Sequence, residues 1–532
     1  MPVKIKGGST MKKVLSLLLT LSMLFSLVTV ATAEEKITLT VMMYERGNTT
    51  NTYGSATDNY WTRWMQTNFG DPNGITLEYI PVPRANDSEK VNTMMAGNSA
   101  PDIIFSYDSN MIMGFGRDGG LHDLTDLVEE YGPNLKANLS MTFPYGTYDG
   151  KLYSIVARRV DVGRYATFMR TDWLDKMGYT LQVNEDGFQH ISVDDFTDLL
   201  RRAKTLDLDN TGMEIYPLGV LGAYHSTQSR PIIYAFVNAD ELTGEMRACY
   251  DELFWPGYKE GVRYLNTLYN EGLIDPDFMV DTDTSYPSFS ALLTNGRMLA
   301  YGHDCNYIAA VEALYEAKPE ANIAPVQLDN IYGKQFVDVY APTGMYIAVP
   351  ATCKHPEAAV KYLDFLADFD NAKVFHYGFE GVHYEMIDGV PTAIAKTKEE
   401  IAADPDNDYE RITVGDMELV YNGKPYGYPT STAGLNEIKT RVTKLQDLGF
   451  KMAEVGGSAP YYFQGIKTEA EEEYDGFLTA PQNSLPALIS CPADQFDAMY
   501  DAVLNDYLAA GGQEVIDSKI ELYHQLEDAK TK

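Results

Sequence analysis

The pattern that most limits the fold is an alternation of strand-like and helix-like segments between residues 37 and 105. Residues 37–41 and 75–79 alternate apolar with polar side chains, and residues 103–105 form a short apolar run. Between them, residues 58–69 and 91–97 carry apolar side chains at helical spacing. Strands separated by helices are typical of a parallel sheet with crossover connections, so we expect an α/β fold.

Ligands of such sheets gather where the strands end at their carboxyl side. Tyr44, Arg46 and Asn48 follow the first expected strand, and Tyr107 and Asp108 follow the third. These side chains donate and accept hydrogen bonds and offer flat apolar rings. We therefore predict that they bind a ligand; the alternative is that they are ordinary surface loop residues.

The amino terminus has the layout of a secretory signal peptide. Lys12 and Lys13 precede an apolar run over residues 14–30, and small residues follow at Ala31 and Ala33. We expect cleavage after residue 33 and an exported mature chain that begins near residue 34. The alternative is a permanent anchor, because roughly 18 apolar residues can just span a bilayer.

Composition excludes some partners. With 76 acidic and 42 basic residues, the formal net charge is −34, which repels nucleic acid and anionic membranes. A length of 532 residues predicts two or more domains. The 38 tyrosines are compatible with aromatic platforms for sugar rings. Four widely spaced cysteines form no metal-binding pattern and are either free or in up to two disulfides: Cys249, Cys305, Cys353 and Cys491.

Six short motifs are spread over most of the chain. They are residues 92–104 (NTMMAGNSAPDII), 149–155 (DGKLYSI), 170–174 (RTDWL), 265–276 (LNTLYNEGLIDP), 354–359 (KHPEAA) and 380–385 (EGVHYE). In this order they resemble the family 1 extracellular solute-binding proteins, the substrate-capturing subunits of ATP-driven importers, and their subgroup of oligosaccharide-binding lipoproteins. The sequence departs from that subgroup because no lipid-accepting Cys follows Ala33. We therefore do not expect a lipid anchor.

The resemblance implies a periplasmic-binding-protein type II fold, with two interleaved α/β lobes and a hinge of crossing segments. We expect residues 34–160 and 325–378 in one lobe and residues 161–324 and 379–532 in the other. It also implies a monomer that captures an oligosaccharide in the cleft and delivers it unchanged to an ABC importer permease. No catalytic residue and no required cofactor are expected. The alternatives are a secreted glycoside hydrolase and a binder of peptides or other solutes.

Further candidates for ligand binding lie at later turns. His303, Asp304 and Tyr307 follow a short strand, where related sugar binders place an aromatic platform and polar groups. Trp255 precedes Pro256 and Gly257 and is predicted to be a loop platform. Near the third expected crossover, three further residues are predicted to line the cleft floor: Glu380, His383 and Tyr384.

Arginines gather at the first expected crossover. Arg158, Arg159 and Arg164 lie close together in a chain that is short of positive charge. They either face an acidic ligand such as a uronate or pair with carboxylates of the lobes and hold the hinge. Pairing is the favoured alternative, and Arg164 is also a candidate ligand-binding residue.

One loop has the spacing of a calcium site. Asp207, Asp209 and Thr211 occupy alternate positions, Gly212 is in the sixth place of an EF-hand-like loop, and Glu214 follows two residues later. Some relatives carry a calcium loop at this place, so a structural calcium ion is a candidate cofactor. Apolar residues replace the late ligands of such a loop, and the alternative is a solvated turn.

Overall fold

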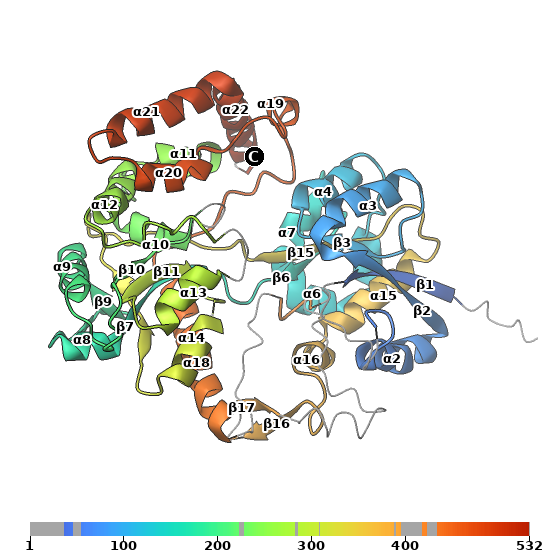
Figure 1. Ribbon diagram of the computed structural model, residues 1–532. Coiled ribbons are helices and arrows are strands. Elements are labelled where there is room, and N and C mark those ends of the chain that lie inside the picture. Colours follow the sequence, from blue (N-terminus) through green and yellow to red (C-terminus); the bar gives the residue numbers. More distant parts are fainter. Residues whose placement is uncertain are drawn as a thin grey trace, which may run out of the picture.

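The computed structural model describes residues 37–45, 55–222, 228–281, 286–307, 309–387, 390–394, 418–422 and 433–530. It has two lobes side by side, joined by crossing segments (Figure 1). The predicted signal peptide and the loop with Arg46 and Asn48 lie outside the described residues. In the described part, no helix is both long and apolar enough to cross a membrane.

The first lobe is built on the predicted parallel strands. β1 (Ile37–Glu45) pairs with β2 (Ile75–Pro83) in parallel, and Val41 forms a parallel bridge with Ile103. β3 (Ile104–Ser106) and β6 (Ile155–Arg158) both pair antiparallel with β15 (Thr343–Ala348). The sheet therefore combines strands from distant parts of the chain. Its helices are α2 (Tyr60–Met65), α3 (Asp87–Ala96), α4 (Ser109–Arg117), α5 (Thr125–Tyr131), α6 (Pro133–Leu139), α7 (Phe143–Gly146), α15 (Pro356–Ala367) and α16 (Phe369–Tyr377).

The second lobe surrounds β7 (Tyr165–Arg170), whose six residues are all buried. β11 (Ala300–Asp304) and β12 (Ile323–Pro325) pair antiparallel with β7, and β10 (Leu218–Gly219) pairs parallel with β11. Its helices are α8 (Thr171–Lys176), α9 (Val193–Lys204), α10 (Arg230–Ile233), α11 (Gly244–Cys249), α12 (Tyr258–Asn270), α13 (Pro287–Thr294), α14 (Ala309–Ala317), α18 (Ala433–Met452), α20 (Leu485–Ser490), α21 (Phe496–Tyr507) and α22 (Gln513–Lys530).

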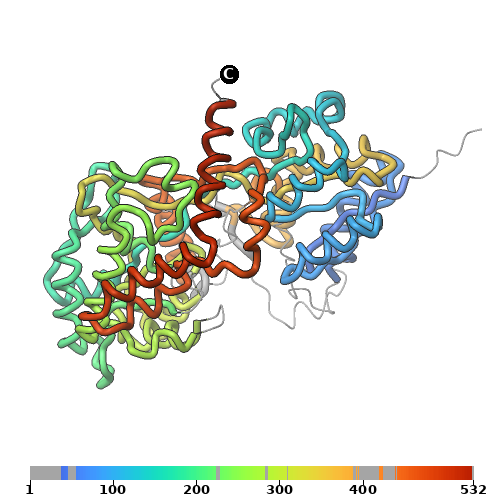
Figure 2. Tube along the Cα trace, turned by 90° about the horizontal axis from the view of Figure 1, so that it is seen from above, coloured from blue at the N-terminus to red at the C-terminus, as the bar shows by residue number. Residues whose placement is uncertain are grey.

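Short elements complete the described structure. They are β4 (Thr147–Tyr148), β5 (Lys151–Leu152), β8 (Gln182–Val183), β9 (Gln189–Ile191), β13 (Gln327–Leu328), β14 (Val337–Asp338), β16 (Tyr384–Ile387), β17 (Val390–Ala393), β18 (Gly457–Ser458) and α19 (Glu469–Glu473). Seen from above, the carboxy-terminal helix stands between the lobes (Figure 2). The segment before it contacts the first lobe, where the Tyr462 ring lies 5.0 Å from that of Tyr145.

The hydrophobic cores show where the chain changes lobe. One core takes buried side chains from residues 39–157, 345–375 and 419–420, and two others take theirs from residues 166–336 and 442–500. Val326 and Phe336 belong to the second lobe, although the expected boundary at residue 325 placed them in the first. Because β12 pairs with β7, the chain stays in the second lobe until about Val339. Leu419 packs in the first core, not the second.

Among the described residues, three crossing segments are hydrogen-bonded to one another through their backbones. The amide N–H of Arg158 donates to the Leu419 carbonyl (2.8 Å), and that of Arg159 donates to Pro342 (3.0 Å). The Val160 N–H donates to the Asn422 carbonyl at 2.9 Å. These bonds join residues 158–160, 342 and 419–422 into a narrow junction, which is the geometry expected of a hinge.

Candidate functional site

Polar and aromatic side chains gather at the carboxyl ends of β1, β2 and β3, as predicted from the strand pattern. The Tyr44 hydroxyl donates to the buried Asp87 carboxylate, which also accepts from Ser106 Oγ (3.1 Å) and Arg84 Nη1 (3.2 Å). The Arg84 guanidinium lies 4.9 Å from the Tyr44 ring centre and 5.3 Å from that of Tyr107. Tyr44 is buried, whereas Tyr107 is 37% exposed and offers part of its ring to a ligand.

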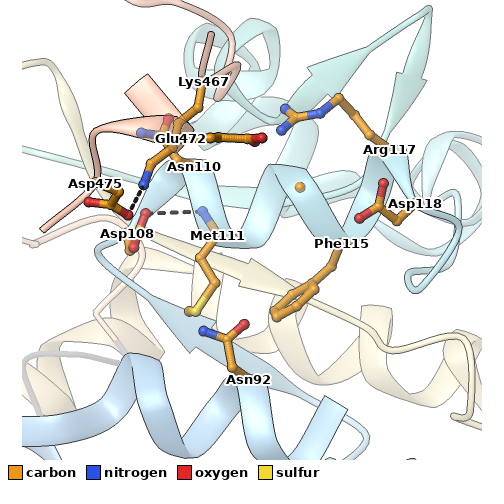
Figure 3. A pocket seen from close by; sticks show the side chains of 11 residues that line it. Asn92, Asp108, Asn110, Met111, Phe115, Arg117, Asp118, Lys467, Glu472 and Asp475 are labelled. Carbon is orange, nitrogen blue, oxygen red and sulfur yellow. Dashed lines mark hydrogen bonds and ion pairs between the residues drawn. The ribbon is translucent and has the colours of Figure 1, made fainter. Parts of the chain in front are cut away.

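Asp108 has a structural role that its position in the sequence explains. Its carboxylate caps α4 by accepting the Met111 N–H at 3.0 Å. It also lines a polar pocket of about 430 Å³ between α4 and the carboxy-terminal segment (Figure 3). Arg117 and Asp118 lie on one side of this pocket, and Lys467 pairs with Asp475 at 3.1 Å on the other. Asp108 therefore faces solvent beside the strand ends.

A second group of side chains lies where the crossing segments enter the second lobe. The Arg159 guanidinium lies over the Tyr340 ring, 3.6 Å from its centre. The Tyr340 hydroxyl donates to Asp304 Oδ2 at 3.1 Å. Burial, with the Asp304 charge acting in the same direction, raises the pKa of Tyr340 to about 12, so this hydroxyl keeps its proton at neutral pH. Asn422 Nδ2 donates to the Tyr107 hydroxyl at 3.3 Å, which connects this group to the first lobe.

The arginines at the junction differ in their partners. Arg164 pairs with Asp338 at 3.6 Å, as the favoured pairing hypothesis predicted, and Arg247 approaches the same carboxylate at 3.8 Å. Burial raises the pKa of Asp338 to about 6, with the Glu252 charge adding to that effect. Arg159 makes no ion pair in the described ranges; its Nε donates to the Asp161 carbonyl at 3.2 Å.

The carboxyl end of β11 is more buried than predicted, because the strand extends through His303 and Asp304, which were expected to follow it. His303 is only 2% exposed, and its ring stacks on Tyr307 with the centres 3.9 Å apart. Tyr286 and Phe289 enclose this pair. His303 therefore packs in the core of the second lobe, and Asp304, the last residue of β11, reaches the junction.

Trp255 does not provide an open platform. It is 6% exposed and packs edge-on against Phe336, with the ring centres 5.8 Å apart. Its neighbours Pro256 and Gly257 suggested a loop, but Phe336 comes from a distant part of the sequence and covers the indole ring. This prediction was wrong.

The residues predicted near the third crossover lie elsewhere. His383 packs against Tyr60 of the first lobe at 4.6 Å, and its Nδ1 accepts the Phe379 N–H at 2.8 Å. Tyr384 is buried and lies 5.7 Å from the Tyr377 ring. Glu380 is exposed on the same turn. Because α16 continues the first lobe, this turn packs beside α2, and His383 and Tyr384 are buried there.

Of the four predicted calcium ligands, Asp207 and Thr211 lie together, but Asp209 and Glu214 have partners elsewhere. Asp209 is directed into the lobe, where it accepts from Trp173 Nε1 (2.9 Å) and pairs with Arg170 (3.2 Å). Asp207 accepts the N–H groups of Thr211 and Gly212, both at 2.7 Å.

Glu214, in turn, pairs with Lys204 at 2.9 Å. Within the described ranges, no group of three or more His, Cys, Asp or Glu side chains is placed to hold a metal. The carboxylates of this loop therefore do not fit a calcium ion as they are arranged.

Sequence reasoning missed Arg84, Tyr340 and Asn422. Arg84 follows the end of β2, so the strand-end rule that singled out Tyr44 and Tyr107 was a sufficient signal for it. Tyr340 and Asn422 lie in crossing segments without a local pattern, and only the paired backbones bring them to the junction.

All four cysteines are buried and free.

Comparisons with known proteins assign the family. A model of the bacterial extracellular solute-binding protein family matches residues 48–373, which is more than half of the chain, so the chain belongs to this family. The chain is 24% identical over 340 residues to lipoprotein LipO of Bacillus subtilis (strain 168), covering 62% of this chain and 65% of that protein. The family resemblance found in the sequence is thereby confirmed.

Two further comparisons add to this result. The polygalacturonan/rhamnogalacturonan-binding protein YtcQ of the same organism is 24% identical over 323 residues, covering 58% of this chain and 61% of that protein. The chain thus spans less than two thirds of both relatives. A solved extracellular solute-binding protein from Bifidobacterium longum subsp. infantis is 15% identical, with a TM-score of 0.66 over 92% of this chain and 99% of that one. This likeness confirms the predicted α/β fold of the type II periplasmic-binding class.

Proposed function

We propose that the chain is exported, captures an oligosaccharide at the lobe junction, and delivers it to the permease of an ABC importer. The observation that carries this proposal is the convergence of groups from both lobes on the crossing segments. Tyr107 comes from the first lobe, Asp304 from the second, and Tyr340 and Arg159 from the crossing segments between them. The ligand named for the YtcQ relative, a polysaccharide, supports a sugar.

The chemistry required is reversible binding. A sugar ring presents C–H groups on its faces and hydroxyls at its edge, which suit an aromatic face and charged or amide hydrogen-bonding groups respectively. A ligand that contacts both lobes at once favours the closed arrangement, because the extra contacts exist only there. The narrow hydrogen-bonded crossing allows this motion without disrupting the cores of the two lobes.

The direct test is a thermal-shift screen of the purified mature chain against glycans and peptides. A ligand that binds only the folded state raises the melting temperature, and the rise grows with ligand concentration relative to Kd. We expect a shift with at least one oligosaccharide and recovery of that sugar intact after incubation. Shifts with peptides alone would assign a different solute, and sustained release of shorter sugars would indicate a glycoside hydrolase.

A further inference from the structure

Arg159 differs from four other arginines around the junction, each of which has a carboxylate partner. Arg84 pairs with Asp87, Arg230 pairs with Glu252 at 2.6 Å, and Arg164 and Arg247 share Asp338. The guanidinium of Arg159 has only a single bond from Nε to the Asp161 carbonyl and the ring of Tyr340 beneath it. In the described part of the chain, neither of its Nη atoms has a hydrogen-bond or ion-pair partner.

This lack of a carboxylate partner is unusual for the composition. The chain has 76 acidic residues for 42 basic ones, so carboxylates outnumber the basic side chains. A shortage of carboxylates therefore does not explain why Arg159 has no carboxylate partner. Arg159 is also partly buried, and burial lowers its pKa despite the opposing effects of Tyr340, Tyr107 and Asp304. Its charge is therefore incompletely compensated by the protein.

The position of Arg159 suits a ligand group. Its backbone N–H is held by the Pro342 carbonyl and its Nε by Asp161, so the guanidinium is fixed while its two Nη atoms remain available. The Tyr340 ring, on a crossing segment, lies against the guanidinium, and Tyr107 of the first lobe is close enough to affect the pKa of Arg159. A planar guanidinium with two available N–H groups matches the geometry of a carboxylate.

We propose that Arg159 binds a carboxylate of the ligand, so that the captured oligosaccharide is acidic and contains uronate residues. This inference rests on the proposed function and specifies the substrate class of the same site. Tyr340 and Tyr107 then contact the sugar rings, and the carboxylate of the sugar supplies the partner that the protein does not. A role for Arg159 in holding the hinge by stacking on Tyr340 is the competing explanation, and it predicts no preference for acidic sugars.

The test is calorimetry with matched sugars. The probes are trimers of galacturonate, mannuronate and glucuronate and the corresponding neutral trimers of galactose, mannose and glucose. We expect at least one acidic trimer to bind about 10- to 100-fold more tightly than its neutral counterpart. Arg159→Gln should remove this difference, and Arg159→Lys should restore part of it because it keeps the charge without the planar fork.

Arg201→Gln is the matched control, because Arg201 pairs with Glu271 on the surface of the second lobe, away from the junction. Arg201→Gln should leave the affinities for the acidic and the neutral trimers unchanged. If Arg159→Gln does not fold, the wild-type comparison and its salt dependence decide the question: affinity for the acidic trimer must fall as salt rises. Equal affinity for acidic and neutral trimers would overturn the inference and leave the proposed function intact. Failure of every sugar to bind would overturn both.

Discussion

The buried carboxylate of Asp209 allows a quantitative test of what holds the second lobe together. Its side chain is 3% exposed and pairs with Arg170, which is 1% exposed, and with Lys176 at 3.2 Å and Lys318 at 3.4 Å. Asp209→Asn keeps the shape and removes the charge. Breaking a buried ion pair from one side costs about 3–5 kcal/mol. We expect about 3 kcal/mol, the lower end, because Asp172 still neutralises Arg170 at 2.6 Å.

The assay is denaturant and thermal unfolding followed by circular dichroism and calorimetry. For a unit of 150–250 residues, a loss of about 3 kcal/mol lowers the melting temperature by roughly 6–12 °C. Asp198→Asn is the control, because Asp198 is exposed and lies 3.9 Å from Arg202, a surface pair that contributes about 0–1 kcal/mol. Equal losses for the two variants would refute the argument.

The pH dependence of stability gives a second test of the ion pair between Asp209 and Arg170. Burial by itself would raise its pKa, but the charge of Arg170 and the bonds from Trp173 outweigh burial and lower it. A carboxylate whose pKa is lower in the folded state stabilises that state above the unfolded value of 3.8. This contribution to stability is lost as the pH falls through the pKa that Asp209 has in the folded state. In Asp209→Asn the acid-induced loss below about pH 4 should therefore be smaller.

Three further predictions concern the junction and the calcium loop. Tyr107→Ala and Asp304→Ala should each weaken oligosaccharide binding in calorimetry about tenfold or more while leaving the melting temperature unchanged; unaltered affinity in both would remove them from the site. Excess calcium and a chelator should give the same melting temperature, because Asp209 and Glu214 are paired elsewhere; a clear rise with calcium would show that the loop rearranges to bind it. Gly163→Ala should cost about 1–3 kcal/mol in urea unfolding, because its new methyl group would collide with the Phe450 carbonyl of α18, and an unchanged midpoint would contradict that contact.

Much of the fold follows from local sequence. The strands β1, β2 and β3 were predictable because alternation and short apolar runs depend on neighbouring residues. The helix α9 begins with a local capping signal, because Ser192 Oγ accepts the Asp195 N–H at 3.1 Å. These features are encoded within a few residues, so one sequence is sufficient to find them.

The site was less predictable because its residues meet through distant pairings. Tyr107 was found from its strand end, but Arg159 meets Tyr340 only because their crossing segments bond to each other. Trp255 and His303 looked like loop residues, and side chains from elsewhere in the chain, such as Phe336 over Trp255, bury them. Burial of an aromatic ring after a turn depends on tertiary packing, which local patterns do not report.

The central claim is that a sugar binds between the two lobes and draws them together. Small-angle X-ray scattering of the mature chain, with and without a saturating oligosaccharide identified by calorimetry, measures this directly. We expect the bound protein to have a smaller radius of gyration, and Tyr107→Ala to need more sugar for the same change. A sugar that binds at saturation without altering the radius of gyration would contradict binding between the lobes.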